Sequence, residues 1–245
     1  MKKWTAFWNI FVKDFRTYYL KPPNLSWGIM FPLAWTLMFF IRSGQSIEGI
    51  TNVLPGITAL SILFGTTSLL AVSITFEKKN RSFERLLLAP LPMELLMLAK
   101  TGGAILFGII NAFVPITIAA FLIDLPNVAW SIFIPAVVLI SIASTFLGLF
   151  IAVAVNEVFE AQTFSNFFRF PMIFLSGLFF PISALPLILK PISFVIPLTY
   201  GADLLHGAIC EKNVMPLPLD LLILTAFCAL LFVLSLRNIK RKWIY

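Results

Sequence analysis

The charged residues of this chain are confined to short segments, and the long segments between them carry none. Five runs lack Asp, Glu, Lys and Arg and reach the length of about 20 residues that a helix needs to cross a bilayer: 22–41, 49–76, 101–123, 125–156 and 170–189. A charged side chain at mid-bilayer costs about 2.5 to 3.5 kcal/mol, so lipid selects for such runs. The pattern indicates a protein that crosses the membrane several times.

A sixth candidate span covers 217–236, with Asp220 close enough to its end to reach the interface. Because six spans use most of the 245 residues, no room remains for a soluble domain of ordinary size. We therefore predict an all-α, polytopic membrane protein with one transmembrane domain over 1–245. It would comprise an interfacial helix (1–21), a six-helix membrane domain (22–236) and a basic tail (237–245).

The basic residues predict the orientation of these spans. With the amino terminus inside, 15 of the 18 Lys and Arg residues lie on inner segments, and only Arg42, Lys190 and Lys212 lie outside. Basic residues collect in the cytoplasmic loops of membrane proteins. We expect both termini in the cytoplasm and the chain in the inner membrane of a prokaryote. The same rule accounts for the net charge of +7 without nucleic acid.

The first 21 residues predict a helix that lies along the membrane surface. Aromatic residues recur at steps of four and three and share one helical face: Trp4, Trp8, Phe11, Phe15 and Tyr18. The basic residues fall largely elsewhere, which is typical of a helix in the headgroup plane. Pro22 and Pro23 would end it. It would serve as an anchor alone or take part in coupling.

Four prolines interrupt the apolar sequence between the fifth and sixth spans: Pro181, Pro186, Pro191 and Pro197. Each piece between them is too short to cross the bilayer. Irregular backbone at membrane depth must be covered by protein. We expect short re-entrant helices here that dip into the outer leaflet and return.

The most highly charged loop lies between the second and third spans, over 76–92. As a helix it would place Phe76, Phe83 and Leu87 on one face and pair Glu77 with Arg81, four residues on. Its mixed charge suits a protein partner better than a lipid surface, which favours a purely basic face. An ordinary solvated loop is the alternative.

Three stretches carry a resemblance to a known family. They are Phe76-Glu77 through Glu84-Arg85-Leu86-Leu87 to Ala89-Pro90-Leu91-Pro92, Phe159-Glu160 followed by 175–186, and Pro197-Leu198-Thr199-Tyr200. In this order and spacing the chain resembles the permeases of type 2 ABC transporters over nearly its whole length. The Arg often found near the third element in that family is missing here.

The resemblance implies a membrane-spanning permease subunit that pairs as a homodimer or heterodimer and binds two cytoplasmic ATPase subunits. It would export a hydrophobic, lipid-linked, drug-like or glycan substrate. The charged loop would be the coupling helix, with ATPase-docking residues Glu77, Arg81, Phe83, Glu84 and Arg85. The outer re-entrant region would include Pro181, Pro186, Pro197 and Tyr200.

Several kinds of site are missing from the sequence. No Gly-x-x-x-x-Gly-Lys-Ser/Thr phosphate loop occurs, so we expect the chain to be no enzyme and ATP to be bound by the partner subunit. With His206 as the single histidine, we expect no metal, cofactor or catalytic residue. An ion-coupled secondary transporter is the alternative function, but it needs ionisable groups near the midplane, where these spans are nearly bare.

Overall fold

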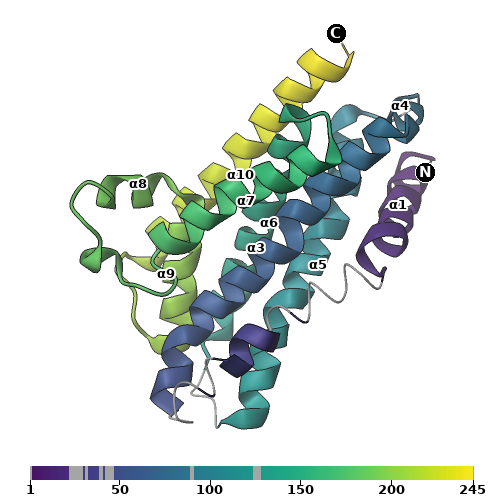
Figure 1. Ribbon diagram of the computed structural model, residues 1–245. Helices are drawn as coiled ribbons and strands as arrows, with labels where there is room; N and C mark the ends of the chain where they lie inside the picture. Colours follow the sequence, from purple (N-terminus) through teal and green to yellow (C-terminus); the bar gives the residue numbers. More distant parts are fainter. Residues whose placement is uncertain are drawn as a thin grey trace.

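The structure is a computed structural model that describes residues 2–21, 30, 33–38, 41, 47–88, 91–123 and 128–244. Every regular element in these residues is a helix (Figure 1), which confirms the all-α prediction for them. The elements are α1 (Lys2–Asp14) with a π-helical turn (Phe15–Tyr19), α3 (Ile47–Lys79), α4 (Ser82–Leu87), α5 (Met93–Leu122), α6 (Trp130–Ala154), α7 (Val158–Leu175), a 3-10 turn (Ile182–Ala184), α8 (Lys190–Val195), α9 (Pro197–Cys210), α10 (Leu217–Ile239) and a π-helical turn (Lys240–Ile244).

Four helices in the described part of the chain are long and apolar enough to cross a membrane. They cover Gly49–Lys79, Met93–Leu122, Trp130–Ala154 and Leu217–Lys242, and they correspond to the expected second, third, fourth and sixth spans. The expected first span, 22–41, lies mostly outside the described residues, although residues 33–38 are helical. That the chain has six spans therefore stays a prediction.

Helices α3 and α6 form the centre of the molecule. In an apolar stretch of 18 residues, 83% of the residues of α3 and 78% of those of α6 are buried. The corresponding shares are 39% for α5 and 22% for α10. A Cβ on Gly148 of α6 would lie 2.5 Å from the carbonyl oxygen of Thr67 on α3, so only glycine permits this approach. Small residues at such contacts let membrane helices pack backbone against backbone. The outer faces of α5 and α10 are left for lipid or another protein.

The expected fifth span over 170–189 is wrong in its bounds, because α7 begins at Val158 and ends at Leu175. Its start is fixed by a capping box, in which Glu157 caps the helix and the Glu160 carboxylate accepts the Glu157 backbone N–H at 3.2 Å. Its end is followed by Gly177, whose φ of 76° turns the chain away from the helix. The capping box and Gly177, rather than the charge-free run 170–189, therefore determine where α7 begins and ends. Helices α8 and α9 then follow, with 6 and 14 residues, each too short to span.

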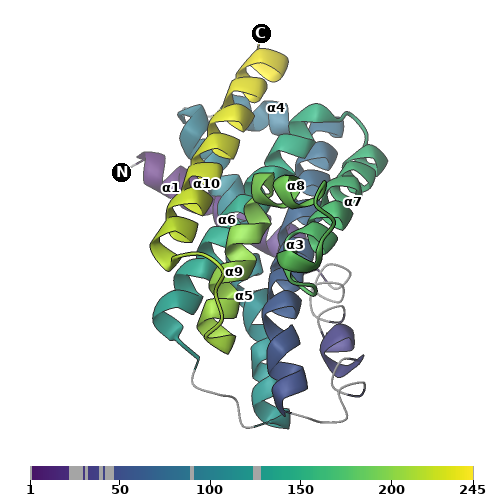
Figure 2. The same ribbon diagram turned by 90° about the vertical axis from the view of Figure 1, so that its left-hand side faces the viewer.

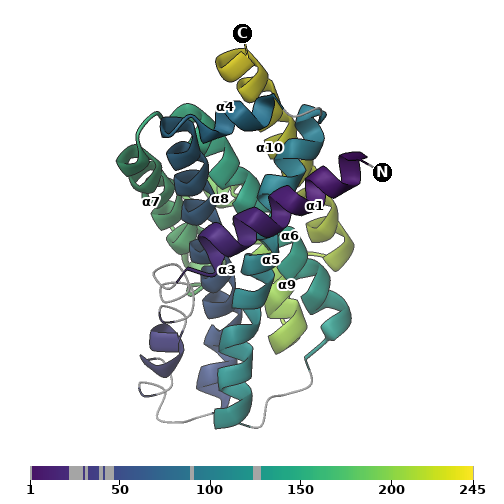
Figure 3. The ribbon, with the colours of Figure 1, turned by 90° about the vertical axis from the view of Figure 1, so that its right-hand side faces the viewer.

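The amino-terminal helix lies obliquely across α5 (Figure 3). Trp4 and Trp8 are 70% and 60% exposed, while Ile10, Asp14 and Tyr19 are buried on another side. The predicted helix is therefore present through Asp14. Its aromatic face is only partly free, and its place in the headgroups stays a prediction.

Figures 1 and 2 show which helix ends lie together at each end of the molecule. Helix α4 and the carboxyl-terminal end of α10 lie at one end of the molecule, while the start of α3 and the end of α5 lie at the other. Helix α9 occupies that second half and packs against α3, α6 and α10. Helix α4 thus lies at one end of the bundle, whereas α8 and α9 lie along its side, from the middle toward the other end.

Candidate functional site

The predicted coupling loop is not one continuous helix. Helix α3 runs to Lys79, the chain turns at Asn80 and Arg81, and α4 begins at Ser82. Arg81 adopts a left-handed conformation with a φ of 55°, which a continuous helix does not permit. The expected pairing of Glu77 with Arg81 is wrong for this reason, since Glu77 belongs to α3 and points elsewhere. The Ser82 hydroxyl bridges the turn by donating to the Glu77 carbonyl oxygen at 3.1 Å.

Helix α4 has one buried face and one exposed face. Phe83 is only 1% exposed and packs into an apolar cluster with residues of α1, α3 and α5. Arg81, Glu84 and Arg85 are exposed on the other side, and Leu88 is 85% exposed just past the helix. Of the five predicted docking residues, three are therefore accessible, while Glu77 and Phe83 are enclosed by the chain itself. The expected common face of Phe76 and Phe83 is also wrong, because Phe76 is exposed.

Glu77 is the centre of a buried network of charges. Its carboxylate forms an ion pair with Lys100 of α5, and its Oε1 accepts hydrogen bonds from Lys13 Nζ at 3.0 Å and from the Tyr18 hydroxyl at 3.1 Å. Lys100 Nζ also donates to Asp14 Oδ2 at 2.8 Å. The Glu77, Lys100 and Asp14 residues are 1%, 2% and 3% exposed. We call these five residues the Glu77 network.

The Glu77 network joins three elements that are far apart in the sequence. It links the end of α1 and its π-helical turn, the last turn of α3 and the first third of α5. Partial burial opposes protonation of Lys13, but the Glu77 hydrogen bond and the Asp14 charge outweigh it and raise the pKa of Lys13. Burial first, and then the Glu77 charge, raise the pKa of Tyr18, so its hydroxyl stays a donor. Buried carboxylates persist only when paired and hydrogen-bonded in this way.

Sequence reasoning missed four members of this network: Lys13, Asp14, Tyr18 and Lys100. Lys100 pairs with Asp14 across 86 residues of sequence, a separation that no local pattern reveals. One signal was present, because Asp14 is the single acidic residue before Glu48. An isolated acid within a basic, aromatic helix indicates a specific partner.

Two further ion pairs hold the α4 end of the molecule together. Lys79 at the end of α3 pairs with Glu157 at the start of α7 at 2.6 Å. Lys240 beyond α10 pairs with Glu94 at the start of α5 at 2.9 Å. Both pairs are about half exposed, so each contributes at most about 1 kcal/mol. Their consequence is geometric, since they tie α7 and α10 to the helices that flank α4.

The residues predicted for the outer region gather around α8 and α9. Pro197 is the first residue of α9, and the Tyr200 hydroxyl donates to the Phe194 carbonyl oxygen at 2.7 Å, which fixes α8 against α9. Pro181 and Pro186 are exposed on the connection before α8. Among the described residues, no group of three or more His, Cys, Asp or Glu residues that could hold a metal ion occurs.

Sequence comparison identifies the family of the chain. The model of a family described as ABC-2 type transporter matches residues 5–209, most of the chain. The chain belongs to the ABC-2 type transporter family. That assignment makes it a permease subunit of an ABC transporter rather than an enzyme, and such permeases normally work with an ATPase subunit.

Two relatives illustrate the membership in the ABC-2 family. The inner membrane transport permease YadH of Escherichia coli (strain K12) is 21% identical over 97% of this chain and 96% of its own length. Nodulation protein J of Sinorhizobium fredii (strain NBRC 101917 / NGR234) is 32% identical over 32% of this chain and 30% of its own length. The first likeness extends over both ends of the bundle, including α4 and α9.

Proposed function

We propose that this ABC-2 permease exports its substrate across the cytoplasmic membrane, with α4 docked on a separate ATPase subunit. One observation carries the docking: α4 and the turn before it present Arg81, Glu84 and Arg85 outward, while Phe83 anchors α4 in the bundle. A short helix with mixed charge on its free side suits a cleft in a protein partner. The anchored side gives any push on α4 a direct path into the membrane helices.

The path from α4 leads through the Glu77 network. Closure of the ATPase pair would move α4 as a rigid body, together with the last turn of α3. Glu77 would pass that motion to α5 through Lys100 and to α1 through Lys13. Three elements would then shift as one unit, since separating them exposes buried charges. The amino-terminal helix thereby takes part in coupling rather than serving as an anchor alone.

The number of subunits and the kind of cargo belong to the same proposal. We assign two permeases, as a homodimer or heterodimer, and two ATPase subunits to the working transporter. Along α7, exposed phenylalanines line one side: Phe164, Phe167, Phe170 and Phe174. An aromatic surface of this kind supports a hydrophobic, lipid-linked or drug-like cargo, or a glycan that stacks on rings.

Charge reversal on α4 tests the docking. The double variant Glu84→Lys with Arg85→Glu keeps the net charge but places like charges opposite each other in the cleft, which costs several kcal/mol. We expect the ATPase that copurifies with the unmodified permease to be lost, with about a tenfold or greater drop in affinity. Lys190→Glu, at α8, is the control and should retain the ATPase. Normal copurification and coupled transport by the double variant would remove α4 from the mechanism.

Ion-coupled transport remains the second candidate because of one buried acid. Asp220 in the first turn of α10 is not exposed, and it lies beside Asp203. A further buried ionisable group, Arg169 of α7, bonds Asn166 and Ser68 and stacks on Phe64. Transport in vesicles distinguishes the two: an ABC exporter needs ATP and its ATPase, whereas ion coupling persists with an ion gradient alone.

A further inference from the structure

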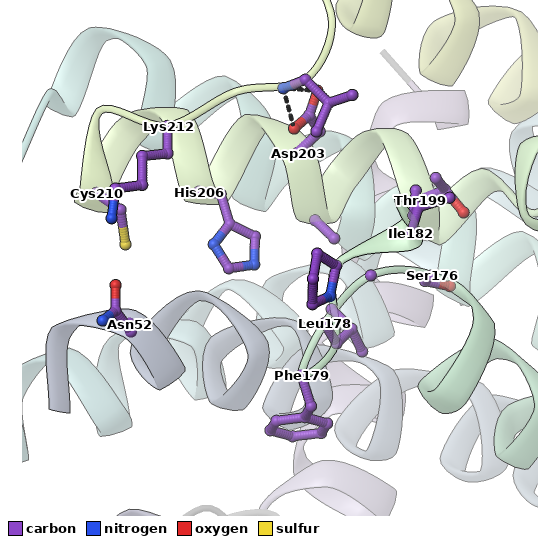
Figure 4. A pocket seen from close by; sticks show the side chains of 14 residues that line it. Asn52, Ser176, Leu178, Phe179, Ile182, Thr199, Asp203, His206, Cys210 and Lys212 are labelled. Atoms are coloured by element: carbon purple, nitrogen blue, oxygen red, sulfur yellow. Dashed lines mark hydrogen bonds between the residues drawn. The ribbon is translucent and has the colours of Figure 1, made fainter. Parts of the chain in front are cut away.

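A cavity of about 380 Å³ lies in the half of the molecule opposite α4. It opens between the start of α3, the turn that follows α7, helix α9 and the loop before α10 (Figure 4). This volume falls in the range of small-molecule sites, roughly 300 to 1,000 Å³. Leu178, Phe179 and Ile182 supply an apolar wall. The space is therefore large enough for a small ligand or for the polar end of a longer one.

Two buried polar atoms of the cavity lining lack partners. Ser176 is 1% exposed, and its Oγ has no hydrogen-bond partner among the described residues. His206 Nε2 is likewise buried and without a partner in that part of the chain. Most buried polar side-chain atoms in proteins are hydrogen-bonded. Two such atoms that line the same cavity are available for hydrogen bonds to a molecule bound there.

Of the two charged side chains in the lining, Lys212 and Asp203, only the lysine is free to bind a ligand. Lys212 lines the cavity and forms no ion pair with any residue the structure describes. Asp203 is the acidic group of the lining, but its carboxylate is engaged by backbone donors, from Val214 at 2.8 and 3.1 Å and from Met215 at 2.8 Å. Burial lowers the pKa of His206 and outweighs the opposing charge of Asp203, so it disfavours the cationic imidazolium. Lys212 is thus the available cation.

The cation of the lining lies at one side of the cavity, whereas polar and apolar side chains are mixed at the other side. Figure 4 shows Lys212, Cys210 and Asn52 toward one side, His206 in the middle, and Ser176 with Ile182 toward the other side. A ligand with a charged head and an apolar body would match this order. The hydroxyl of Ser176 could then bond a second oxygen of the same molecule.

We infer that this cavity binds a phosphorylated amphiphile, with its phosphate at Lys212 and His206 and its apolar body against Leu178, Phe179 and Ile182. The ammonium group of lysine is a common phosphate ligand in proteins. The phosphate belongs either to a lipid headgroup of the adjacent leaflet or to a free phosphorylated molecule. That the cavity faces the outside of the cell rests on the proposed orientation, whereas binding itself does not.

The native thiol of Cys210 reports occupancy, because it lines the same cavity and is half-buried. In the Cys228→Ala background, the rate of alkylation of Cys210 by iodoacetamide is measured on the chain purified in a maltoside detergent. We expect hexyl phosphate to slow alkylation by about fivefold at about four times its Kd, following 1 + [L]/Kd. Hexanol and inorganic phosphate at the same concentration should each change the rate by less than about twofold.

Three variants tie the protection to the cation. Lys212→Gln should lose the protection by hexyl phosphate, while Lys212→Arg keeps it. Lys190→Gln removes a cation that does not line the cavity and should behave as the unmodified chain. Each variant is first checked for an unchanged melting temperature. Protection by hexanol or by inorganic phosphate equal to that by hexyl phosphate overturns the inference, as does full protection in Lys212→Gln.

The source of the phosphate is read from a second measurement on the same thiol. Slower alkylation in phosphatidylglycerol nanodiscs than in maltoside, abolished in Lys212→Gln, assigns a lipid headgroup. Unchanged alkylation in nanodiscs, with protection by added hexyl phosphate retained, assigns a free phosphorylated ligand. No protection under either condition overturns the inference. Because no ATPase is present, such a failure leaves the coupling proposal for α4 untouched.

Discussion

Lys100 is one cation that contacts two buried carboxylates, Asp14 and Glu77. All three side chains are at most 4% exposed, so water does not compensate their charges. Removal of one partner from a buried ionic group costs about 3 to 5 kcal/mol, because the remaining charges are left unpaired. The stability of the junction between α1, α3 and α5 should therefore depend on this single ammonium group.

We predict that Lys100→Met lowers the free energy of unfolding by about 3 to 5 kcal/mol. Thermal or denaturant unfolding in detergent, followed by tryptophan fluorescence, measures the change. Lys240→Met is the matched control, since it breaks only the half-exposed pair with Glu94 and should cost at most about 1 kcal/mol. Adding Asp14→Asn and Glu77→Gln to Lys100→Met should restore stability in part. If the two lysine substitutions lowered the free energy of unfolding equally, the buried network would contribute no more to stability than an exposed ion pair.

Helix α4 has only six residues, so packing rather than helix propensity holds it in place. We predict that Phe83→Ala destabilises α4 locally, because truncation of a buried Phe costs about 3 to 5 kcal/mol. Amide hydrogen exchange over Ser82–Leu87 should rise, and affinity for the ATPase should fall. Leu88→Ala, at a side chain that is 85% exposed, should leave the exchange unchanged. Faster exchange across the whole bundle in Phe83→Ala would instead indicate global unfolding.

The long apolar helices were predictable from the sequence because charge is excluded from lipid. Helices α3, α5 and α6 follow from charge-free runs alone, and α10 from a run that contains only Asp220, with errors of a few residues at most ends. Helix α5 shows the limit, since it begins at Met93 and includes Glu94 and Lys100. Helix α7 was misplaced because its start depends on a capping box and its end on Gly177. Those local signals are present in the sequence, but they lie outside or within the charge-free run and do not change its length.

The candidate site was predicted only in part, for a different physical reason. The exposed side of α4, with Glu84 and Arg85, follows from the mixed charge of the loop. The break at Arg81 could not be predicted, because a non-glycine residue rarely adopts a positive φ. The partners of Glu77 come from α1 and α5, and such long-range pairings arise only when the bundle packs. Pattern reasoning therefore finds the exposed half of the coupling site and misses the buried half.

The whole bundle has two chemically different ends, and the proposed mechanism requires them to face opposite sides of the membrane. One end carries α4 and the basic residues beyond α10, which the positive-inside rule places in the cytoplasm. The other end carries α9 and the cavity with Lys212. The proposed ATPase can reach only the first of these ends, whereas a ligand in the second meets the permease from outside.

Labelling of single thiols tests this orientation in intact cells. In the Cys210→Ala, Cys228→Ala background, an Arg81→Cys thiol should react with a membrane-impermeant maleimide only after the cells are opened. In the Cys228→Ala background, native Cys210 should react without opening the cells, although slowly, because burial raises the pKa of its thiol. The two thiols are reciprocal controls for access and for reactivity. If Arg81→Cys reacted from outside in intact cells, α4 would lie beyond the reach of any cytoplasmic ATPase, and the coupling mechanism would be excluded.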